Sequence, residues 1–190
     1  RIREMVAQDM HVGKDTVFFN SGGTEGNNTV IRGVLGARRG NMHAITTMAE
    51  HSSVVETFNA MKQKGYKIDI LGVDNQGYVN EAELMQALRR DTALVSLMHV
   101  NNEVGAVNDI TSLAKRVHGI LPQCVFHSDG VQAYPKIPFP QGVDAYTVSG
   151  HKFHAPRGTG IMYIKENLML EPLVTGGGQE YGMRGGTENG

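Results

Sequence analysis

Short apolar runs alternate with segments of helical periodicity along most of this chain of 190 residues. Residues 93–98 form an almost continuous apolar run, which is typical of a strand covered on both faces. Residues 24–39 instead place apolar side chains on one face of a helix. This alternation predicts an α/β fold, with a mostly parallel sheet and helices on both of its faces. The predicted strands are residues 16–19, 42–46, 66–71, 93–98, 124–126, 143–148 and 160–164, and the predicted helices are residues 24–39, 52–64, 80–89 and 109–119.

The composition argues against several classes of protein. The chain has 18 Lys and Arg residues against 19 Asp and Glu residues, so its formal net charge is −1 and no nucleic-acid partner is expected. No apolar run approaches the roughly 20 residues that a membrane span needs, so no membrane partner is expected either. The chain carries no recognisable leader, and its single cysteine rules out an internal disulfide. We therefore expect a cytoplasmic protein.

Polar residues follow five of the predicted strands, close to the carboxyl end of each. Open parallel sheets bind their ligands at that edge. Because polar residues scattered at random would not favour one edge so consistently, the pattern predicts a single site there. The residues are Ser21 to Thr24, then Glu50 and His51, then Asn101 to Glu103, then Asp129 and Gln132, and finally Ser149, His151 and Lys152.

Lys152 is the candidate nucleophile, because an amine at a strand end can attack a carbonyl and form a Schiff base. Taken alone, a loop lysine is more often a solvated charge. Gly23 and Thr24 lie where a helix begins, and free backbone N–H groups there suit a phosphate, although an ordinary turn with a threonine cap explains them equally well. Asp129 could hold a positively charged ring nitrogen, or could be a helix cap or a surface carboxylate.

Three further residues complete the candidate site. His51 could stack on a flat ring and carry protons, although a single histidine is more often structural. Asn102 and Gln132 could hydrogen-bond a ring hydroxyl, although amides commonly serve loops. Together, a phosphate cradle, a carboxylate for a ring nitrogen and a lysine amine describe a site for pyridoxal phosphate.

A metal-dependent hydrolase is the alternative from a different class. Its ligands would be His51, His127, Asp129, His151 and His154. His151 and His154 form an H-x-x-H pair, but in a Gly- and Pro-rich loop rather than on a helix, so the spacing does not fix their geometry. This alternative leaves Lys152 and the phosphate cradle unexplained.

Six motifs stand along the chain in a fixed order. They are Ser21-Gly22-Gly23-Thr24-Glu25, Glu50-His51-Ser52, residues 99–105, residues 129–132, residues 149–153, and residues 176–180 together with 184–189. In this order they resemble the cysteine desulfurases of the class V pyridoxal-phosphate-dependent aminotransferases, over nearly the whole chain. The resemblance implies that residues 1–190 are the large cofactor-binding domain of a fold-type I transferase. It also implies that an N-terminal segment and a C-terminal small domain are absent from this chain.

The resemblance implies a role for each candidate residue. Lys152 would bond to the aldehyde of pyridoxal 5'-phosphate and later move the substrate α-proton. Asp129 would pair with the ring nitrogen, and His51 would stack on the ring and assist proton transfer. Asn102 and Gln132 would address the phenolic oxygen of the ring. The phosphate would be bound by Gly23, Thr24, Ser149 and His151, and by Thr187 of the neighbouring subunit in a homodimer.

The family reaction takes sulfur from L-cysteine, leaves L-alanine, and passes an enzyme persulfide to an acceptor such as an iron–sulfur scaffold protein. In the family, the persulfide cysteine and the arginine that grips the substrate carboxylate lie beyond the position of Gly190, so we expect this fragment alone to be inactive. Cys124 lies in an apolar run and is expected to be an inert core residue. A selenocysteine lyase, or another class V lyase or aminotransferase, is the nearest alternative.

One departure from the family pattern carries a structural expectation. Gly130 stands where the family usually has an alanine packed on the ring. We therefore expect one face of the ring to be held less firmly in this protein.

Overall fold

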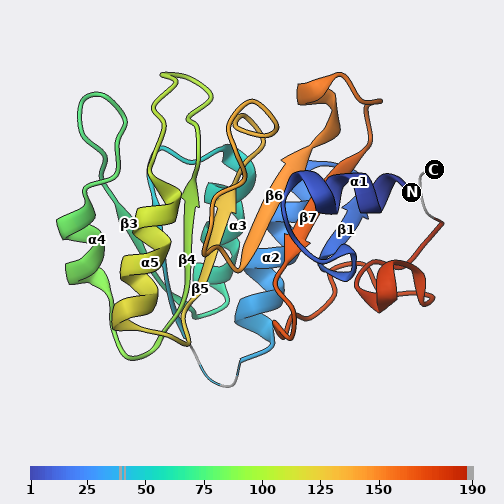
Figure 1. Ribbon diagram of the computed structural model, residues 1–190. Helices are drawn as coiled ribbons and strands as arrows, with labels where there is room; N and C mark the ends of the chain where they lie inside the picture. Colours follow the sequence, from blue (N-terminus) through green and yellow to red (C-terminus); the bar gives the residue numbers. More distant parts are fainter. Residues whose placement is uncertain (39, 41, 188–190) are drawn as a thin grey trace.

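The computed structural model describes residues 1–38, 40 and 42–187. A sheet of seven strands runs through the molecule in the order β1-β7-β6-β5-β4-β2-β3 (Figure 1). The strands are β1 (Val17–Asn20), β2 (His43–Thr47), β3 (Lys67–Leu71), β4 (Thr92–Met98), β5 (Val125–Asp129), β6 (Ala145–Ser149) and β7 (Gly160–Ile164). The α-helices are α1 (Ile2–Asp9), α2 (Gly23–Gly36), α3 (Ser52–Gln63), α4 (Glu81–Ala87) and α5 (Ile110–Ile120).

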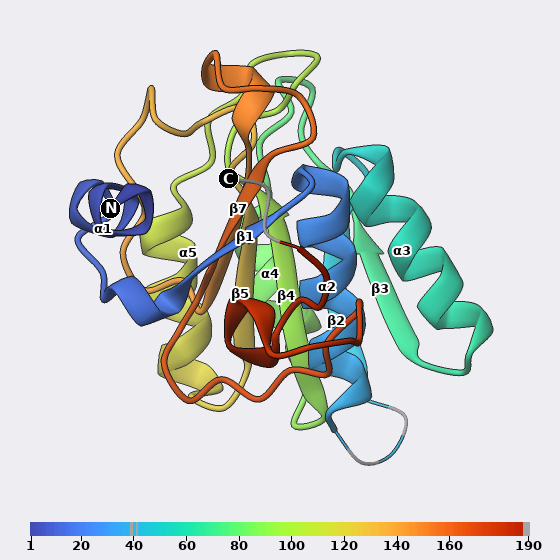
Figure 2. The same ribbon diagram turned by 90° about the vertical axis from the view of Figure 1, so that its right-hand side faces the viewer.

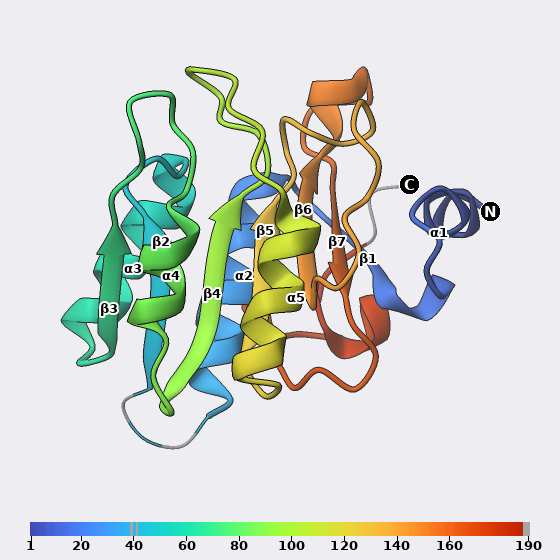
Figure 3. The same cartoon turned by 60° about the vertical axis from the view of Figure 1, so that its left-hand side comes forward.

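Strands β3, β2, β4, β5 and β6 pair in parallel, and β7 pairs antiparallel with both β6 and β1. The predicted α/β fold with a mostly parallel sheet is therefore confirmed, and every predicted strand is present with its ends displaced by a few residues at most. Helices α2 and α3 cover one face of the sheet and α4 and α5 cover the other, as the two rotated views show (Figures 2 and 3). The three-layer arrangement explains the apolar run of β4, since every residue of that strand is buried.

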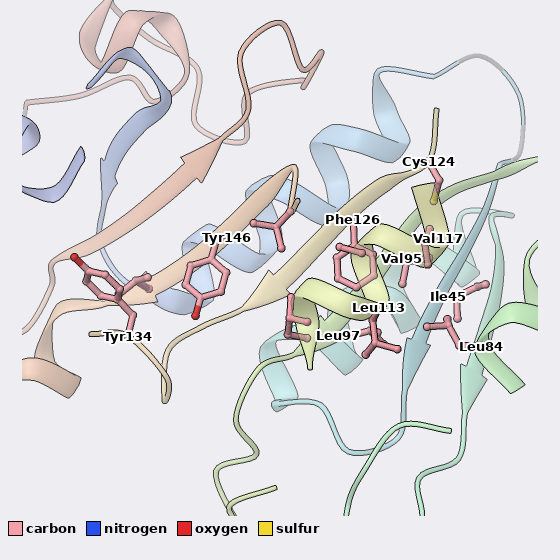
Figure 4. Packing of buried hydrophobic residues seen from close by; sticks show 14 of the residues in the cluster. Ile45, Leu84, Val95, Leu97, Leu113, Val117, Cys124, Phe126, Tyr134 and Tyr146 are labelled. Carbon is pink, nitrogen blue, oxygen red and sulfur yellow. The ribbon is translucent and has the colours of Figure 1, made fainter. Parts of the chain in front are cut away.

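Two hydrophobic clusters fill the space between the sheet and its helices. On the α5 side, Phe126 and Leu97 of the sheet pack close to Leu113 of the helix (Figure 4). On the opposite side, Val30 and Ile31 of α2 pack among strand residues and α3. Burial on both faces holds the central strands rigidly, so the side chains at their carboxyl ends have fixed starting points.

The last part of the described chain returns across α2 toward β1. Arg3 forms a two-pronged ion pair with the buried Glu180, with Nη1–Oε2 and Nη2–Oε1 distances of 2.8 Å. Glu180 also accepts a hydrogen bond of 2.9 Å from the backbone N–H of Phe19. These bonds hold the short 3-10 helix Gln179–Gly182 against β1. None of the helices in the described part of the chain has the length and apolar character to cross a membrane.

Candidate active site

A pocket of about 270 Å³ opens at the carboxyl ends of β4, β5 and β6, where these strands meet the starts of α2 and α3. Every residue to which the sequence assigned a role toward the cofactor lines this pocket except Thr187, which is exposed and lies outside it. The predicted strand-end residues Ser21, Gly22, Glu50, Asn101 and Glu103 do not line it. The remaining lining comes from residues to which the sequence assigned no role. The lining residues are Gly23, Thr24, Asn27, His51, Ser53, Met98, Asn102, Asp129, Val131, Gln132, Ser149, His151 and Lys152.

Asp129 is the last residue of β5 and is only 2% exposed. Its Oδ1 accepts a hydrogen bond of 2.9 Å from the Val131 backbone N–H, and its Oδ2 accepts one of 2.7 Å from Asn27 Nδ2. Burial raises the pKa of Asp129, and these two hydrogen bonds offset that effect only partly. A buried carboxylate whose hydrogen-bond donors are all neutral is stabilised by a cationic ligand group placed beside it.

His51 caps the N-terminus of α3, and its Nδ1 accepts a hydrogen bond of 3.1 Å from the Ser53 backbone N–H. Ser53 Oγ lies 2.8 Å from the same nitrogen, and it accepts a hydrogen bond of 2.9 Å from Asn27 Nδ2. His51 is thus connected to Asp129 through Asn27 and Ser53, which the sequence analysis missed. One signal could have found Asn27, because it is a polar residue on the inward face of α2, beside Val30 and Ile31.

Lys152 lies on the 3-10 helix Gly150–Phe153, which directly follows β6, and its side chain is partly buried at the pocket. The turn is fixed at its start, because the Gly150 N–H donates to the Thr159 carbonyl at 2.9 Å. Ser149 is buried at the end of β6, and its Oγ lies 2.9 Å from His151 Nδ1. The structure therefore brings Lys152 and Asp129 into one pocket from neighbouring strands.

The beginning of α2 forms another wall of the pocket. Gly22 precedes the helix with φ of +146°, a conformation that side chains with a Cβ rarely adopt, and its N–H donates to Asn20 Oδ1 at 2.9 Å. A Cβ on Gly23 would lie 2.6 Å from Val131 Cγ2, so glycine is needed for this close approach. The first turn of a helix of this length offers free N–H groups and a positive dipole end to an anion.

The ligand set of the hydrolase alternative is not assembled. The described residues contain no group of three or more His, Cys, Asp or Glu side chains that could hold a metal ion. His127 is fully buried in β5 and does not line the pocket; its Nδ1 lies 2.8 Å from Ser96 Oγ and its Nε2 lies 3.0 Å from Thr147 Oγ1. Burial lowers the pKa of His127 to about 3, as expected for a neutral structural histidine.

The expectation for Gly130 is wrong in its geometry. A Cβ on Gly130 would lie 1.9 Å from Cζ of Tyr146, whose ring belongs to the α5-side cluster. The apolar group beside Asp129 that does line the pocket is Val131, one residue later. The absence of a side chain at Gly130 therefore makes room for Tyr146.

Cys124 is buried, as predicted. Burial raises the pKa of its thiol to about 12, which leaves it almost entirely protonated at neutral pH. Cys124 is therefore an inert core residue.

The fold and the pocket define the class first: the chain has the fold-type I arrangement of pyridoxal-phosphate-dependent enzymes. A family model described as "Aminotransferase class-V" matches residues 1–188. The chain therefore belongs to the class-V aminotransferase family, whose members depend on pyridoxal phosphate.

Relatives and solved structures agree with the cysteine desulfurase resemblance seen in the motifs. A "NifS/IcsS protein homolog" of Lactobacillus delbrueckii subsp. bulgaricus is 45% identical over 98% of this chain and 50% of its own length. "Cysteine desulfurase 2" of Trichormus variabilis is 42% identical over 98% of this chain and 47% of its own length. A solved structure described as "NIFS-LIKE PROTEIN" matches 98% of this chain and 52% of its own chain, with a TM-score of 0.95 and 39% identity. Another, "SspA in complex with cysteine", matches 98% and 55%, with a TM-score of 0.94 and 32% identity. The chain thus spans about half the length of the curated relatives it matches.

Proposed function

We propose that this chain is the cofactor-binding large domain of a pyridoxal-phosphate-dependent cysteine desulfurase. The enzyme takes sulfur from L-cysteine, leaves L-alanine, and passes the sulfur from an enzyme persulfide to an acceptor. The observation that carries the proposal is that Lys152, the buried Asp129 and the N-terminus of α2 line one pocket. The similarity to NifS-like proteins and cysteine desulfurases along 98% of the chain supports this choice of reaction within the family.

The residues of the pocket fit pyridoxal 5'-phosphate. Asp129 is buried, has its pKa raised by that burial, and suits a protonated ring nitrogen. The start of α2, with Gly22 and Gly23 in positions that exclude other side chains, suits a phosphate. When bound, the cofactor supplies an electron sink for the charge that develops at the substrate α-carbon.

Each predicted residue has a place in this proposal. Lys152 would hold the cofactor aldehyde and, when free, would take and return the α-proton as a general base. His51 would pack on the ring and assist proton transfer. Asn102 and Gln132 would hydrogen-bond the phenolic oxygen. The phosphate contacts are proposed for Gly23, Thr24, Ser149 and His151.

The remaining parts of the reaction are proposed to lie outside this chain. These parts are the persulfide cysteine and the arginine for the substrate carboxylate, since Cys124 is buried and protonated. Thr187 is exposed and outside the pocket, which suits our proposal that it reaches the phosphate of a partner subunit in a homodimer. An iron–sulfur scaffold or another sulfur carrier is the proposed acceptor, and the cytoplasm is the proposed location.

The test uses the full-length protein. It should be yellow, and borohydride should change its visible band and fix a pyridoxyl group on Lys152, identified by peptide mapping. Lys152→Ala should lose both properties, whereas Lys136→Ala, at an exposed lysine outside the pocket, should keep them. A colourless protein that cannot be reconstituted would refute the cofactor assignment.

A second assay tests the choice of reaction. L-Cysteine should yield equal amounts of alanine and acceptor-bound sulfur. A much higher kcat/KM for L-selenocysteine than for L-cysteine would instead support the selenocysteine lyase alternative.

A further inference from the structure

A chain of four side chains runs from Asp129 to His51 along the wall of the pocket. Asn27 Nδ2 donates to Asp129 Oδ2 at 2.7 Å and to Ser53 Oγ at 2.9 Å. Ser53 Oγ lies 2.8 Å from His51 Nδ1. Asn27 is 1% exposed and Ser53 is 9% exposed, so water does not compete strongly for the two hydrogen bonds that Asn27 donates.

The orientation of the Asn27 amide follows from its partners. An ionised carboxylate only accepts hydrogen bonds, so the Nδ2 side of the amide must face Asp129. Asn27 Oδ1 is then buried with no hydrogen-bond partner among the described residues. A buried unsatisfied carbonyl costs free energy, and such costs are commonly found at functional sites. Asn27 Oδ1 therefore stays unsatisfied in the orientation in which both N–H donors of Asn27 face Asp129 and Ser53.

The direction of each remaining hydrogen bond follows from the amide. Because Ser53 Oγ accepts from Asn27, its own hydroxyl hydrogen is free to donate to His51 Nδ1. The Ser53 backbone N–H also donates to that nitrogen, at 3.1 Å. Two donors converge on Nδ1, so the proton of the neutral imidazole is carried by Nε2. The other ring nitrogen of His51 thereby becomes the proton-carrying atom that is available at the pocket.

We propose that Asn27 and Ser53 are positioning residues for the cofactor, Asn27 by keeping Asp129 ionised and oriented, and Ser53 by fixing His51 as the Nε2–H tautomer. This inference rests on the proposed function for its cofactor but concerns residues that the family motifs did not assign. The two residues act through Asp129 and His51, which are the groups that contact the ring in the proposed function. Asn27 itself belongs to α2 and is buried facing Ser53 of α3 and Asp129 of β5.

The Asn27 arm is tested with full-length protein, by titrating the cofactor-free form with pyridoxal 5'-phosphate. Asn27→Ala removes a donor to a charged group, and such hydrogen bonds typically account for about ten- to a hundredfold in affinity. We expect the dissociation constant to rise at least about tenfold and the pH profile of the visible band to shift. The matched control is Asn28→Ala. Among the described residues, the Asn28 side chain donates to the Thr24 carbonyl and accepts from Arg32 Nε, and both partners belong to α2. A lower unfolding midpoint with an unchanged dissociation constant and pH profile would show that Asn27 is only a core residue.

The Ser53 arm does not need the cofactor. In the cofactor-free protein, ¹⁵N NMR of labelled histidine should show His51 with an unprotonated Nδ1, the signal being assigned with a His51→Gln variant. Ser53→Ala should raise the Nδ1-protonated fraction, Ser53→Thr should restore the original signal, and Ser52→Ala on the exposed side of α3 should change nothing. A proton on Nδ1 in the unmodified protein would overturn the tautomer assignment. No response to Ser53→Ala would mean that the backbone N–H of residue 53 fixes the tautomer by itself, which would overturn the positioning role of the Ser53 hydroxyl.

The cofactor titration and the NMR measurement distinguish a failure of the hydrogen-bonded chain Asp129–Asn27–Ser53–His51 from a failure of the proposed function. If the unmodified protein fails to bind pyridoxal 5'-phosphate, the proposed function fails. The NMR measurement still decides whether Ser53 fixes the tautomer of His51. If the unmodified protein binds the cofactor and Asn27→Ala binds it equally well, the positioning role of Asn27 fails alone.

Discussion

Two buried aspartates lie at opposite ends of neighbouring strands, and the chain treats their charges differently. Asp144 directly precedes β6, is 5% exposed, and lies 2.8 Å from both His118 Nε2 and Lys165 Nζ. Burial alone would raise the pKa of Asp144, but its hydrogen bonds to His118 and Lys165 outweigh burial and lower it. Asp129 ends β5 and is 2% exposed, and burial raises its pKa. Its hydrogen-bond donors, the neutral groups of Val131 and Asn27, lower that pKa too little to cancel the effect of burial.

The difference separates a structural charge from a functional one. At the amino edge of the sheet the protein supplies its own cations, so Asp144 is satisfied within the fold. At the carboxyl edge the protein supplies burial and neutral donors but only a more distant attraction from His51, so Asp129 is left to be stabilised by a ligand. A buried charge in that condition costs stability until the ligand arrives, as is common for binding sites.

The largest expected effect is on activity. Asp129→Asn should lower kcat/KM of the full-length enzyme for L-cysteine by about a thousandfold, the upper range for losing one preorganised electrostatic group. Its free energy of unfolding without cofactor should stay the same or rise, since the substitution removes a poorly compensated buried charge. Steady-state kinetics and urea unfolding measure the two quantities. If Asp129→Asn keeps its activity, Asp129 has no catalytic role.

Asp144→Ala should have the opposite profile. The substitution leaves the buried Phe126 N–H without its acceptor, whereas His118 and Lys165 are partly exposed and can turn to water. We therefore expect a loss of about 2 kcal/mol in the free energy of unfolding. Activity should be nearly unchanged at temperatures where the variant stays folded. The control is Glu56→Ala, an exposed carboxylate on α3. A loss of activity larger than the loss of folded protein would contradict the purely structural role of Asp144.

The sequence predicted the edge of the sheet where the site lies but not the difference between these aspartates. Hydrophobic periodicity and apolar runs in the sequence located every strand. The ends of the strands then located Asp129 and Lys152, because the direction of a parallel strand determines which edge of the sheet its last residue reaches. The environment of a carboxylate depends instead on distant residues. Asp144 meets His118 from α5 and Lys165 from beyond β7, and Asn27 reaches Asp129 across 102 positions of the sequence.

One α-helix and the direction of one strand were missed for local reasons. Helix α1 was not predicted, because Ile2 and Met5 are exposed and obscure the buried face of a short helix. The antiparallel direction of β7 was not predicted either, although the stretch between β6 and β7 is too short for the dozen or more residues of a parallel crossover. Loop length would have revealed that reversal from the sequence.

Glu50 offers a third buried carboxyl, next to the pocket residue His51. Its Oε1 accepts hydrogen bonds of 2.9 Å from Thr47 Oγ1 and from the Met98 N–H, and its Oε2 has no partner among the described residues. Burial raises the pKa of Glu50 to about 8, despite these bonds. Between pH 4.5 and 8 the folded protein therefore keeps a proton that the unfolded chain releases. Stability due to this group should fall as pH rises through that window, by up to about 1.4 kcal/mol per pH unit.

Glu50→Gln tests this expectation, because glutamine resembles the protonated acid. Urea unfolding of the cofactor-free variant should match the unmodified protein near pH 5 and show greater stability at pH 9. Glu56→Gln should follow the unmodified protein throughout. Parallel curves for the unmodified protein and Glu50→Gln would mean that Glu50 is ionised in the folded state at neutral pH.

The smallest expected effect concerns His118, which contributes to the satisfied state of Asp144. The hydrogen bond to Asp144 raises the pKa of His118 above its ordinary value of 6.5. A raised histidine pKa means that the stabilisation is fully present below pH 6.5 and is lost as pH rises through the raised value, while Asp144 stays ionised. His118→Gln should therefore lose about 1 kcal/mol in the free energy of unfolding at pH 6 and less at pH 9. The control is His11→Asn. His11 is exposed and has a positive φ of 55°, a backbone conformation that asparagine adopts readily. Equal losses at both pH values would mean that His118 acts on Asp144 as a neutral hydrogen-bond donor. The contrast with Asp129 would then depend on Lys165 as the only cation that this edge supplies to Asp144 among the described residues.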